Sequence, residues 1–165
     1  MSSAAKAEKP GPKHPGVKFP PPFLFVAGLA LGFLLDRCWP VPWIPASWGT
    51  YRFALGWGIV ALGLGLGAWG FITFLRARTA ILPHHPASRL VYAGPYRYTR
   101  NPMYVGLTGG YLGIAVLIDS LWPLLFLPAV LAALYRFVIR REERYLTAEF
   151  GAAYEDYRRK VRRWL

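Results

Sequence analysis

Four stretches of the chain are almost purely apolar, and polar segments separate them. Residues 53–75 contain no charge, and residues 102–118 and 121–139 form two further apolar runs. A bilayer core of about 30 Å requires roughly 20 apolar residues in a helix, so each run predicts a transmembrane helix. Residues 23–35 are shorter and reach only about 20 Å at 1.5 Å per residue. They predict either a fourth span, over about 23–38, or a re-entrant or surface helix.

The polar segments between the runs predict the topology. Only Asp119 and Ser120 separate residues 102–118 from residues 121–139, which predicts a helical hairpin with a tight turn. With four spans and the N-terminus inside, 18 of the 20 Lys and Arg residues fall in inside segments, and only Arg37 and Arg52 lie outside. This positive-inside bias favours four spans with both termini cytoplasmic. Three spans would separate the N-terminal lysines from the other inside charges.

Composition supports a membrane protein and excludes other classes. The 165 residues are 55% hydrophobic and 17% charged, with a formal net charge of +12, whereas a soluble domain carries about a quarter charged residues. The positive-inside rule accounts for the basic excess, so we expect no nucleic-acid partner. Cys38 is the single cysteine, which excludes an internal disulfide, and the adjacent His84 and His85 lack the spacing of metal ligands. We therefore expect no metal site.

The expected fold is an all-α integral membrane protein with about four transmembrane helices. Residues 1–22 contain six prolines and four lysines and predict a disordered basic tail. Residues 23–165 predict one membrane domain that ends in a cytoplasmic helical segment over 140–165. There, apolar residues recur every three or four positions from Leu146 to Trp164. This pattern predicts a helix that lies on the inner membrane surface or folds over the cytoplasmic loop as a lid.

Polar residues that could bind a ligand are concentrated in the expected cytoplasmic loop, residues 76–101, and at the start of the next helix. Asn101 and Pro102 predict the N-cap and first-turn proline of that helix. A helix N-terminus offers free N–H groups to an anion, and the guanidinium groups of Arg97 and Arg100 suit carboxylates or phosphates. Neighbouring aromatic rings could hold an adenine or a sulfonium cation, although interfacial anchoring is the more frequent role for tyrosine at this depth. These rings belong to Tyr96, Tyr98 and Tyr104.

A second polar constellation follows the last apolar run, where residues 140–144 are all charged. Neighbouring helix positions point about 100° apart, so Glu142 and Glu143 cannot both face the bundle. One glutamate could pair with arginines while the other points at a ligand. A solvated charge collar explains most of the arginines here, but it does not require two adjacent glutamates.

Two motifs resemble a superfamily of integral membrane methyltransferases. The sequence GPYRYTRNPMYVG at residues 94–106 resembles its GPYRYxRHPMYxG signature. The sequence EERYL at residues 142–146, followed by the FG pair at 150–151 and tyrosines at 154 and 157, resembles its EExxL…FGxxYxxY block. The superfamily contains isoprenylcysteine carboxyl methyltransferases and phospholipid N-methyltransferases.

The resemblance implies a cofactor, a substrate class and a set of contacts. It implies that S-adenosylmethionine binds at the cytoplasmic face and that a lipid or prenyl-like substrate enters from the bilayer. The expected setting is a multi-pass protein surrounded by the membrane lipids of a prokaryotic inner membrane. Asn101 stands where the signature has histidine and resembles phosphatidylethanolamine N-methyltransferases, whereas the C-terminal block is more similar to bacterial isoprenylcysteine-type members. The acceptor is therefore either a carboxylate or an amine. The implied cofactor contacts are Leu90, Val91, Gly94, Tyr96, Arg100, Asn101, Pro102, Tyr104, Glu142 and Glu143.

The candidate catalytic residues are Glu143, Arg140 and Arg141. Glu143 could help an amine acceptor to lose its proton, and either arginine could orient a carboxylate acceptor. One alternative is a membrane sterol reductase that binds NADPH, because that group has a similar Arg-His-Pro-x-Tyr motif and acidic C-terminal pattern. Four spans are few for that group, and Asn101 fits it poorly. The other alternative is a non-enzymatic membrane scaffold, in which glycine pairs pack the helices and the basic tail anchors the chain.

Overall fold

The computed structural model describes residues 16, 20–77 and 90–165. The α-helices are α1 (Pro22–Cys38), α2 (Tyr51–Arg76), α3 (Pro102–Ile118), α4 (Leu121–Leu134), α5 (Arg140–Phe150) and α6 (Ala152–Lys160). Two short 3₁₀ segments, η1 (Ala46–Trp48) and η2 (Gly94–Arg97), and one π-helical segment, η3 (Tyr135–Ile139), complete the described helices. The described residues contain no β-strand, so the expected all-helical fold is confirmed. Most of the predicted basic tail, together with His84 and His85, lies outside the described residues.

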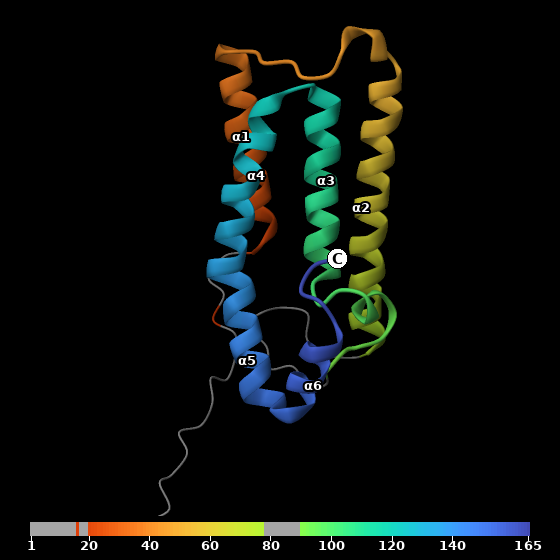
Figure 1. The fold of residues 1–165 in the computed structure, drawn as a ribbon, viewed down its shortest axis with the longest axis vertical. Helices are drawn as coiled ribbons and strands as arrows, with labels where there is room; N and C mark the ends of the chain where they lie inside the picture. Colours follow the sequence, from red (N-terminus) through yellow and green to blue (C-terminus); the bar gives the residue numbers. More distant parts are fainter. Residues whose placement is uncertain (1–15, 17–19, 78–89) are drawn as a thin grey trace, which may run out of the picture.

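The four long helices run up and down side by side (Figure 1). α2 packs along α3, and α1 packs along α4. α4, η3 and α5 form one continuous helix from Leu121 to Phe150. As Figure 1 shows, α5, α6, the C-terminus and the described part of the α2–α3 loop all lie toward the same end of the bundle.

Two helices are long and apolar enough to cross a membrane. They are the helices Tyr51–Arg76 and Leu121–Phe150. α1 and α3 have 17 residues each, which gives about 25 Å at 1.5 Å per residue. Their length is therefore somewhat below the thickness of a typical hydrocarbon core. Two candidate spans support a membrane protein, and four crossings remain a prediction.

The turn between α3 and α4 holds the opposite end of the bundle together. Asp119 adopts a left-handed conformation with φ of 53°. Its Oδ1 accepts the main-chain N–H groups of Trp43 and Ile44 at 3.2 and 2.9 Å, and its Oδ2 pairs with Arg52 at 2.9 Å. The tight Asp119–Ser120 turn that the sequence predicts is confirmed, and it also anchors the connection between α1 and α2.

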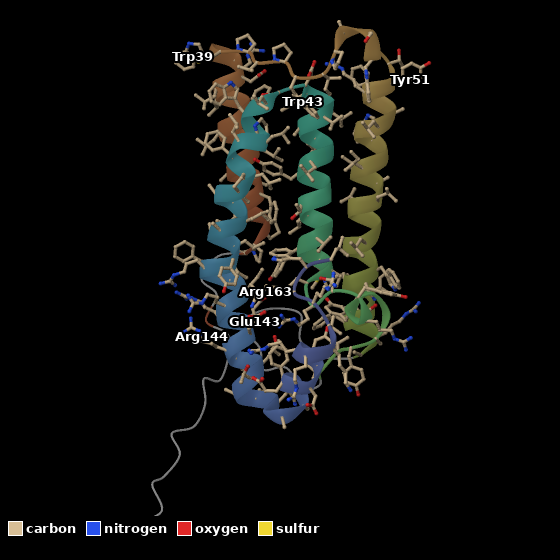
Figure 2. The ribbon with its side chains drawn as sticks, in the orientation of Figure 1. Trp39, Trp43, Tyr51, Glu143, Arg144 and Arg163 are labelled. Atoms are coloured by element: carbon tan, nitrogen blue, oxygen red, sulfur yellow. The ribbon has the colours of Figure 1, made fainter. Side chains whose placement is uncertain are left out.

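Exposed aromatic side chains gather at the end of the bundle that Asp119 closes, and the Glu143–Arg163 ion pair lies toward the other end. Figure 2 shows Trp39, Trp43 and Tyr51 at the end that Asp119 closes, and Glu143 and Arg163 in the half nearer α5. Trp39 is 64% exposed and Tyr51 is 76% exposed. Exposed aromatic rings at a bundle end are typical of residues that sit at the headgroup level of a membrane.

The C-terminal segment is not a single helix. Gly151, with φ of 49°, separates α5 from α6, and glycine adopts this conformation without a steric penalty. α6 ends at Lys160, and Val161 is extended, with φ of −120° and ψ of 132°. The prediction of a helical segment over 140–165, with one apolar face running to Trp164, is therefore wrong beyond Lys160, because the last five residues leave the helix to contact the loop before α3.

α2 and α3 approach so closely that their contact requires glycine. A Cβ atom on Gly63 would lie 2.6 Å from the carbonyl oxygen of Gly106 and 2.6 Å from the nitrogen of Gly110. Both neighbours are backbone atoms, so neither can move without displacing a helix. Gly65 lies on the same helix, and a Cβ atom there would meet nothing within 4 Å.

Replacement of Gly63 by alanine is expected to destabilise the bundle by about 1–3 kcal/mol, because an added methyl group in a close-packed contact forces the helices apart. Thermal unfolding of the detergent-purified protein measures the effect. Gly65→Ala is the matched control and should keep or raise the melting temperature, since alanine favours helix over glycine by about 1 kcal/mol. Equal melting temperatures for the two variants would contradict the close approach.

Candidate active site

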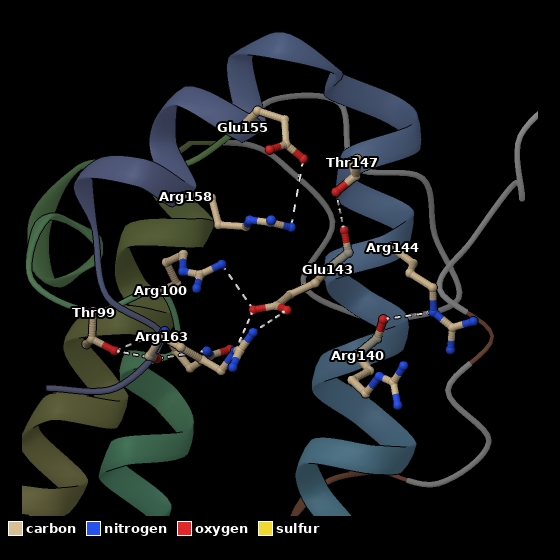
Figure 3. Close-up of polar contacts among 10 residues, drawn as sticks. Thr99, Arg100, Arg140, Glu143, Arg144, Thr147, Glu155, Arg158 and Arg163 are labelled. Atoms are coloured by element: carbon tan, nitrogen blue, oxygen red, sulfur yellow. Dashed lines mark hydrogen bonds and ion pairs between the residues drawn. The ribbon is translucent and has the colours of Figure 1, made fainter.

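Three segments far apart in the sequence meet around Glu143 of α5 (Figure 3). Arg163 of the C-terminal tail donates from Nε to Oε1 of Glu143 at 2.8 Å and from Nη2 to Oε2 at 3.0 Å. Arg100 of the loop before α3 pairs through Nη1 with the same Oε1 at 3.0 Å. The side chains of Glu143 and Arg100 are only 14% and 10% exposed. A carboxylate removed from water in this way requires compensating charge, and here the two guanidinium groups supply it.

The main chain of the C-terminal tail pairs with the loop. The main-chain N–H of Arg100 donates to the carbonyl oxygen of Arg162 at 2.9 Å. The hydroxyl of Thr99, which is 1% exposed, donates to the carbonyl oxygen of Arg163 at 3.1 Å. The tail, residues 161–165, is thereby fixed to the loop by its backbone, while the side chain of Arg163 joins it to α5.

Asn101 precedes α3 but does not cap it with its side chain. Pro102 begins the helix, as the sequence predicts. The Nδ2 group of Asn101 instead donates to the carbonyl oxygen of Arg163 at 3.0 Å, and its main-chain N–H donates to the hydroxyl of Thr99 at 3.2 Å. The predicted N-cap position is confirmed and the predicted capping hydrogen bond is absent, because the amide is turned toward the tail.

Glu142 has different surroundings from those of Glu143. Tyr104 of α3 donates its hydroxyl proton to Oε1 of Glu142 at 2.8 Å. No ion pair to Glu142 occurs among the residues that the structure describes. Of the two adjacent glutamates, one is held by arginines, as the sequence suggested, and the other by a neutral phenol.

The π-helical segment η3 lies directly before this pair of glutamates. A π-helical turn advances the chain with an i→i+5 hydrogen bond and is frequent at functional sites. Val138 and Ile139 at its end are buried at 2% and 0% exposure. The segment thus packs firmly on the core while it sets the direction in which α5 presents Glu142 and Glu143.

Three tyrosines line the meeting point of the loop and α6: Tyr96 and Tyr154 are buried, and Tyr157 is half-buried. Tyr96 is 5% exposed, and its hydroxyl has no hydrogen-bond partner among the described residues. Tyr157 of α6 donates its hydroxyl proton to the carbonyl oxygen of Tyr96 at 2.8 Å. Tyr154, beside Tyr157 on α6, is 1% exposed.

Burial raises the pKa of all three phenols above the ordinary tyrosine value. For Tyr96, desolvation is the main cause, and the proximity of Tyr157 and Glu142 adds to it. Desolvation also dominates for Tyr154 and Tyr157. The three hydroxyl groups therefore stay protonated at neutral pH and can donate hydrogen bonds. An unpaired buried hydroxyl is costly, so the Tyr96 group is suited to meet a ligand.

The remaining predicted contacts lie in the loop before Tyr96. Leu90 is half-buried and Val91 is 8% exposed. Gly94 has φ of 57°, and a Cβ atom there would lie 2.8 Å from the hydroxyl of Thr73 on α2. Gly94 therefore packs closely against α2.

Arg140 and Arg141 are not brought to the Glu143 cluster. Arg140 is exposed, and no dashed line in Figure 3 joins its guanidinium group to Glu143. Arg141 donates from Nη1 to the carbonyl oxygen of Gly16 at 2.7 Å. Neither arginine therefore shares a contact with the predicted cofactor residues.

Sequence reasoning missed Thr99, Tyr135 and Arg163. The guanidinium carbon of Arg163 lies 5.0 Å from the centre of the Tyr135 ring, in range of a cation–π interaction. Arg163 belongs to a basic cluster that the positive-inside rule already explains, so nothing in the pattern distinguishes it. Thr99 occupies a variable position of the loop signature.

The described residues hold no group of three or more His, Cys, Asp or Glu that could bind a metal ion. The polar groups of the site are carboxylates, guanidinium groups and phenols. Such a set suits an organic ligand with both charged and hydrogen-bonding groups.

A family model described as phospholipid methyltransferase matches residues 51–153. The chain belongs to this family. The matched region runs from the first residue of α2 into the first turn of α6, so it contains Arg100, Glu142 and Glu143 and leaves out the C-terminal tail. The superfamily resemblance that the two motifs carry is thereby confirmed.

Curated relatives extend the comparison. A protein-S-isoprenylcysteine O-methyltransferase of Schizosaccharomyces pombe is 40% identical over 72 residues, which are 44% of this chain and 30% of that protein. A phosphatidylethanolamine N-methyltransferase of the same yeast is 34% identical over 119 residues, 62% of this chain and 12% of that protein. The cobalt-zinc-cadmium resistance protein CzcN of Cupriavidus metallidurans is 39% identical over 70 residues, 42% of this chain and 32% of that protein.

The matches thus span between 12% and 32% of the length of these relatives. No solved structure is significantly similar to the chain.

Proposed function

We propose that this protein transfers a methyl group from S-adenosylmethionine to a lipid-borne acceptor at the membrane surface. The observation that carries the proposal is the convergence of the two motif segments. Arg100 of the first motif contacts Glu143 of the second, and Tyr104 of the first contacts Glu142 of the second. Membership of the phospholipid methyltransferase family and the two methyltransferase relatives support this chemistry.

Within this site, Glu142 is the acidic residue that we propose to face the cofactor. Its only hydrogen-bond partner among the described residues is the Tyr104 hydroxyl, so it can accept from an ammonium group or a ribose hydroxyl. Both oxygens of Glu143 are already engaged by guanidinium groups. We therefore assign Glu143 the task of holding the loop and the tail against α5, in place of the acid–base role that the sequence suggested.

Other residues fit the cofactor in complementary ways. The buried hydroxyl of Tyr96 lacks a partner among the described residues and can donate to a polar group of the ligand. The N-terminal turn of α3 carries no side-chain cap and favours an anionic group such as a carboxylate. The full set of proposed cofactor contacts is Leu90, Val91, Gly94, Tyr96, Arg100, Asn101, Pro102, Tyr104 and Glu142, and Glu143 of the predicted set is left out because its oxygens are engaged.

S-adenosylmethionine, when bound, supplies an electrophilic methyl group on a sulfonium. The chain's own contribution is then alignment and exclusion of water. Buried Tyr154 and half-buried Tyr157 serve this by covering the loop from α6. The acceptor is either an isoprenylcysteine-type carboxylate or a phospholipid amine. Arg140 and Arg141 lie where the apolar part of the long helix ends, and we propose that they orient the acceptor only if it is a carboxylate.

We further propose that all four long helices cross the membrane, with both termini on the cytoplasmic side. α1 and α3 lie beside the two helices that are long enough to span, and the antiparallel order of the four in Figure 1 brings α5, α6 and the tail to one side. A lipid chain would then reach the site from the bilayer while the cofactor arrives from the cytosol.

Addition of S-adenosylmethionine or S-adenosylhomocysteine is expected to raise the melting temperature of the detergent-purified protein. A ligand at 100 times its dissociation constant adds about 2.7 kcal/mol to the free energy of unfolding. NADPH should give no shift. A shift with NADPH alone would identify a reductase, and no shift with any of the three compounds would favour a scaffold.

Glu142→Gln is expected to weaken S-adenosylhomocysteine binding by about 10- to 100-fold, because a hydrogen bond to a charged group contributes about 1.5–3 kcal/mol. Isothermal titration measures the dissociation constant. Glu149→Gln is the matched control, since Glu149 lies on the same helix with an exposed side chain and should bind as the unchanged protein does. Unaltered binding by Glu142→Gln would exclude Glu142 from the site.

Cys38 is the chain's single cysteine and lies exposed at the end of α1 away from α5, so it reports topology directly. A membrane-impermeant maleimide added to intact right-side-out vesicles should label it. A Cys38→Ser protein that carries Arg159→Cys on α6 should be labelled only after the vesicles are permeabilised. The reverse pattern would overturn the proposed orientation, and labelling of both from outside would overturn the four crossings.

A further inference from the structure

We infer that Arg163 is a positioning residue of this site and that the C-terminal tail, residues 161–165, forms part of it. The ligand-binding part of this inference rests on the proposed function. Arg163 lies outside residues 51–153, which the family match covers. Its role comes from its contacts, which join both motif segments although it belongs to neither.

Arg163 is held at both of its ends. Its carbonyl oxygen accepts from the hydroxyl of Thr99 at 3.1 Å and from Nδ2 of Asn101 at 3.0 Å. Its guanidinium group donates two hydrogen bonds to Glu143 on α5. A single residue thus spans from the loop before α3 to the long helix Leu121–Phe150, as Figure 3 shows.

The position of this guanidinium group is fixed by further contacts. It lies over the ring of Tyr135, 5.0 Å from the ring centre, and its hydrogen bond to Glu143 raises the pKa of Arg163. The next residue, Trp164, packs against the hydrophobic cluster that includes Tyr111 and Leu134. Trp164 therefore anchors the tail in the bundle. This anchor restricts the movement of the chain end and keeps Arg163 beside Glu143.

Loss of this guanidinium group would affect both the loop before α3 and α5. Glu143 would keep Arg100 as its one described cationic partner, and a buried carboxylate with too little compensation rearranges or draws in water. The loop carries Tyr96 and Asn101, whereas α5 carries Glu142. Since a displacement of about 1 Å can reduce rates by 10²-fold, a looser link between these segments should weaken the binding of a ligand that contacts both.

The test compares Arg163→Gln with Lys160→Gln, which removes the same charge from an exposed side chain three residues earlier. Isothermal titration with S-adenosylhomocysteine should give a dissociation constant about 10- to 100-fold higher for Arg163→Gln and an unchanged one for Lys160→Gln. Arg163→Lys should recover part of the affinity, because lysine restores the charge but not the paired hydrogen bonds. Equal affinity in Arg163→Gln and the unchanged protein would overturn the inference.

Amide hydrogen exchange without ligand supplies a readout that does not depend on the proposed function. In Arg163→Gln, the amide of Arg100, which donates to the carbonyl oxygen of Arg162, should exchange faster, while amides within α2 and α3 stay protected. Faster exchange throughout the bundle would indicate general destabilisation and overturn the inference. If the unchanged protein binds no S-adenosylhomocysteine, the proposed function fails, and the exchange result alone then decides whether Arg163 holds the loop to α5.

Discussion

The half of this protein that carries α5 and α6 depends on the neutralisation of one buried carboxylate. Glu143 is 14% exposed and receives a guanidinium group from the loop before α3 and another from the C-terminal tail. Because a carboxylate out of water is costly without such partners, α5, the loop and the tail must meet at one place. The tyrosines, Asn101 and Glu142 are arranged around that meeting point. The ion-pair cluster therefore organises the site, although Glu142 is the residue that we propose to face the ligand.

The bundle above the site supplies a rigid frame for this cluster. α2 and α3 pack through backbone contacts at Gly63 and Gly106, which fixes the start of α3 and with it Tyr104. On the other side, the core cluster around Tyr111 and Leu134 includes Val138 and Ile139 of the π-helical segment. The start of α3 and the helix that carries Glu142 and Glu143 are thus each attached to packed helices. The contacts between these two parts of the site are polar.

The contacts around the site extend further toward the C-terminus than the family match does. The match ends at residue 153, whereas the contacts that join loop and α5 involve residues up to 164. The relatives act on an isoprenylcysteine and on phosphatidylethanolamine, as their names state, so the shared segments are compatible with chemically distinct acceptors.

The sequence alone determined the helical runs, the tight Asp119–Ser120 turn and the family, because hydrophobic periodicity and short motifs are local properties. It also showed that Glu142 and Glu143 would have different partners, since adjacent helix positions point in different directions. Only the tertiary structure decided which partners they have. Arg163 could not be distinguished from the other arginines of a basic cluster, because its role depends on a chain reversal at Gly151 and on the extended tail after Lys160. The helix predicted beyond Lys160 is absent for the same reason. Hydrogen bonds of Thr99, Arg100 and Asn101 to the tail replace those of another helical turn. Contacts between residues some sixty positions apart leave no periodic signal in the sequence.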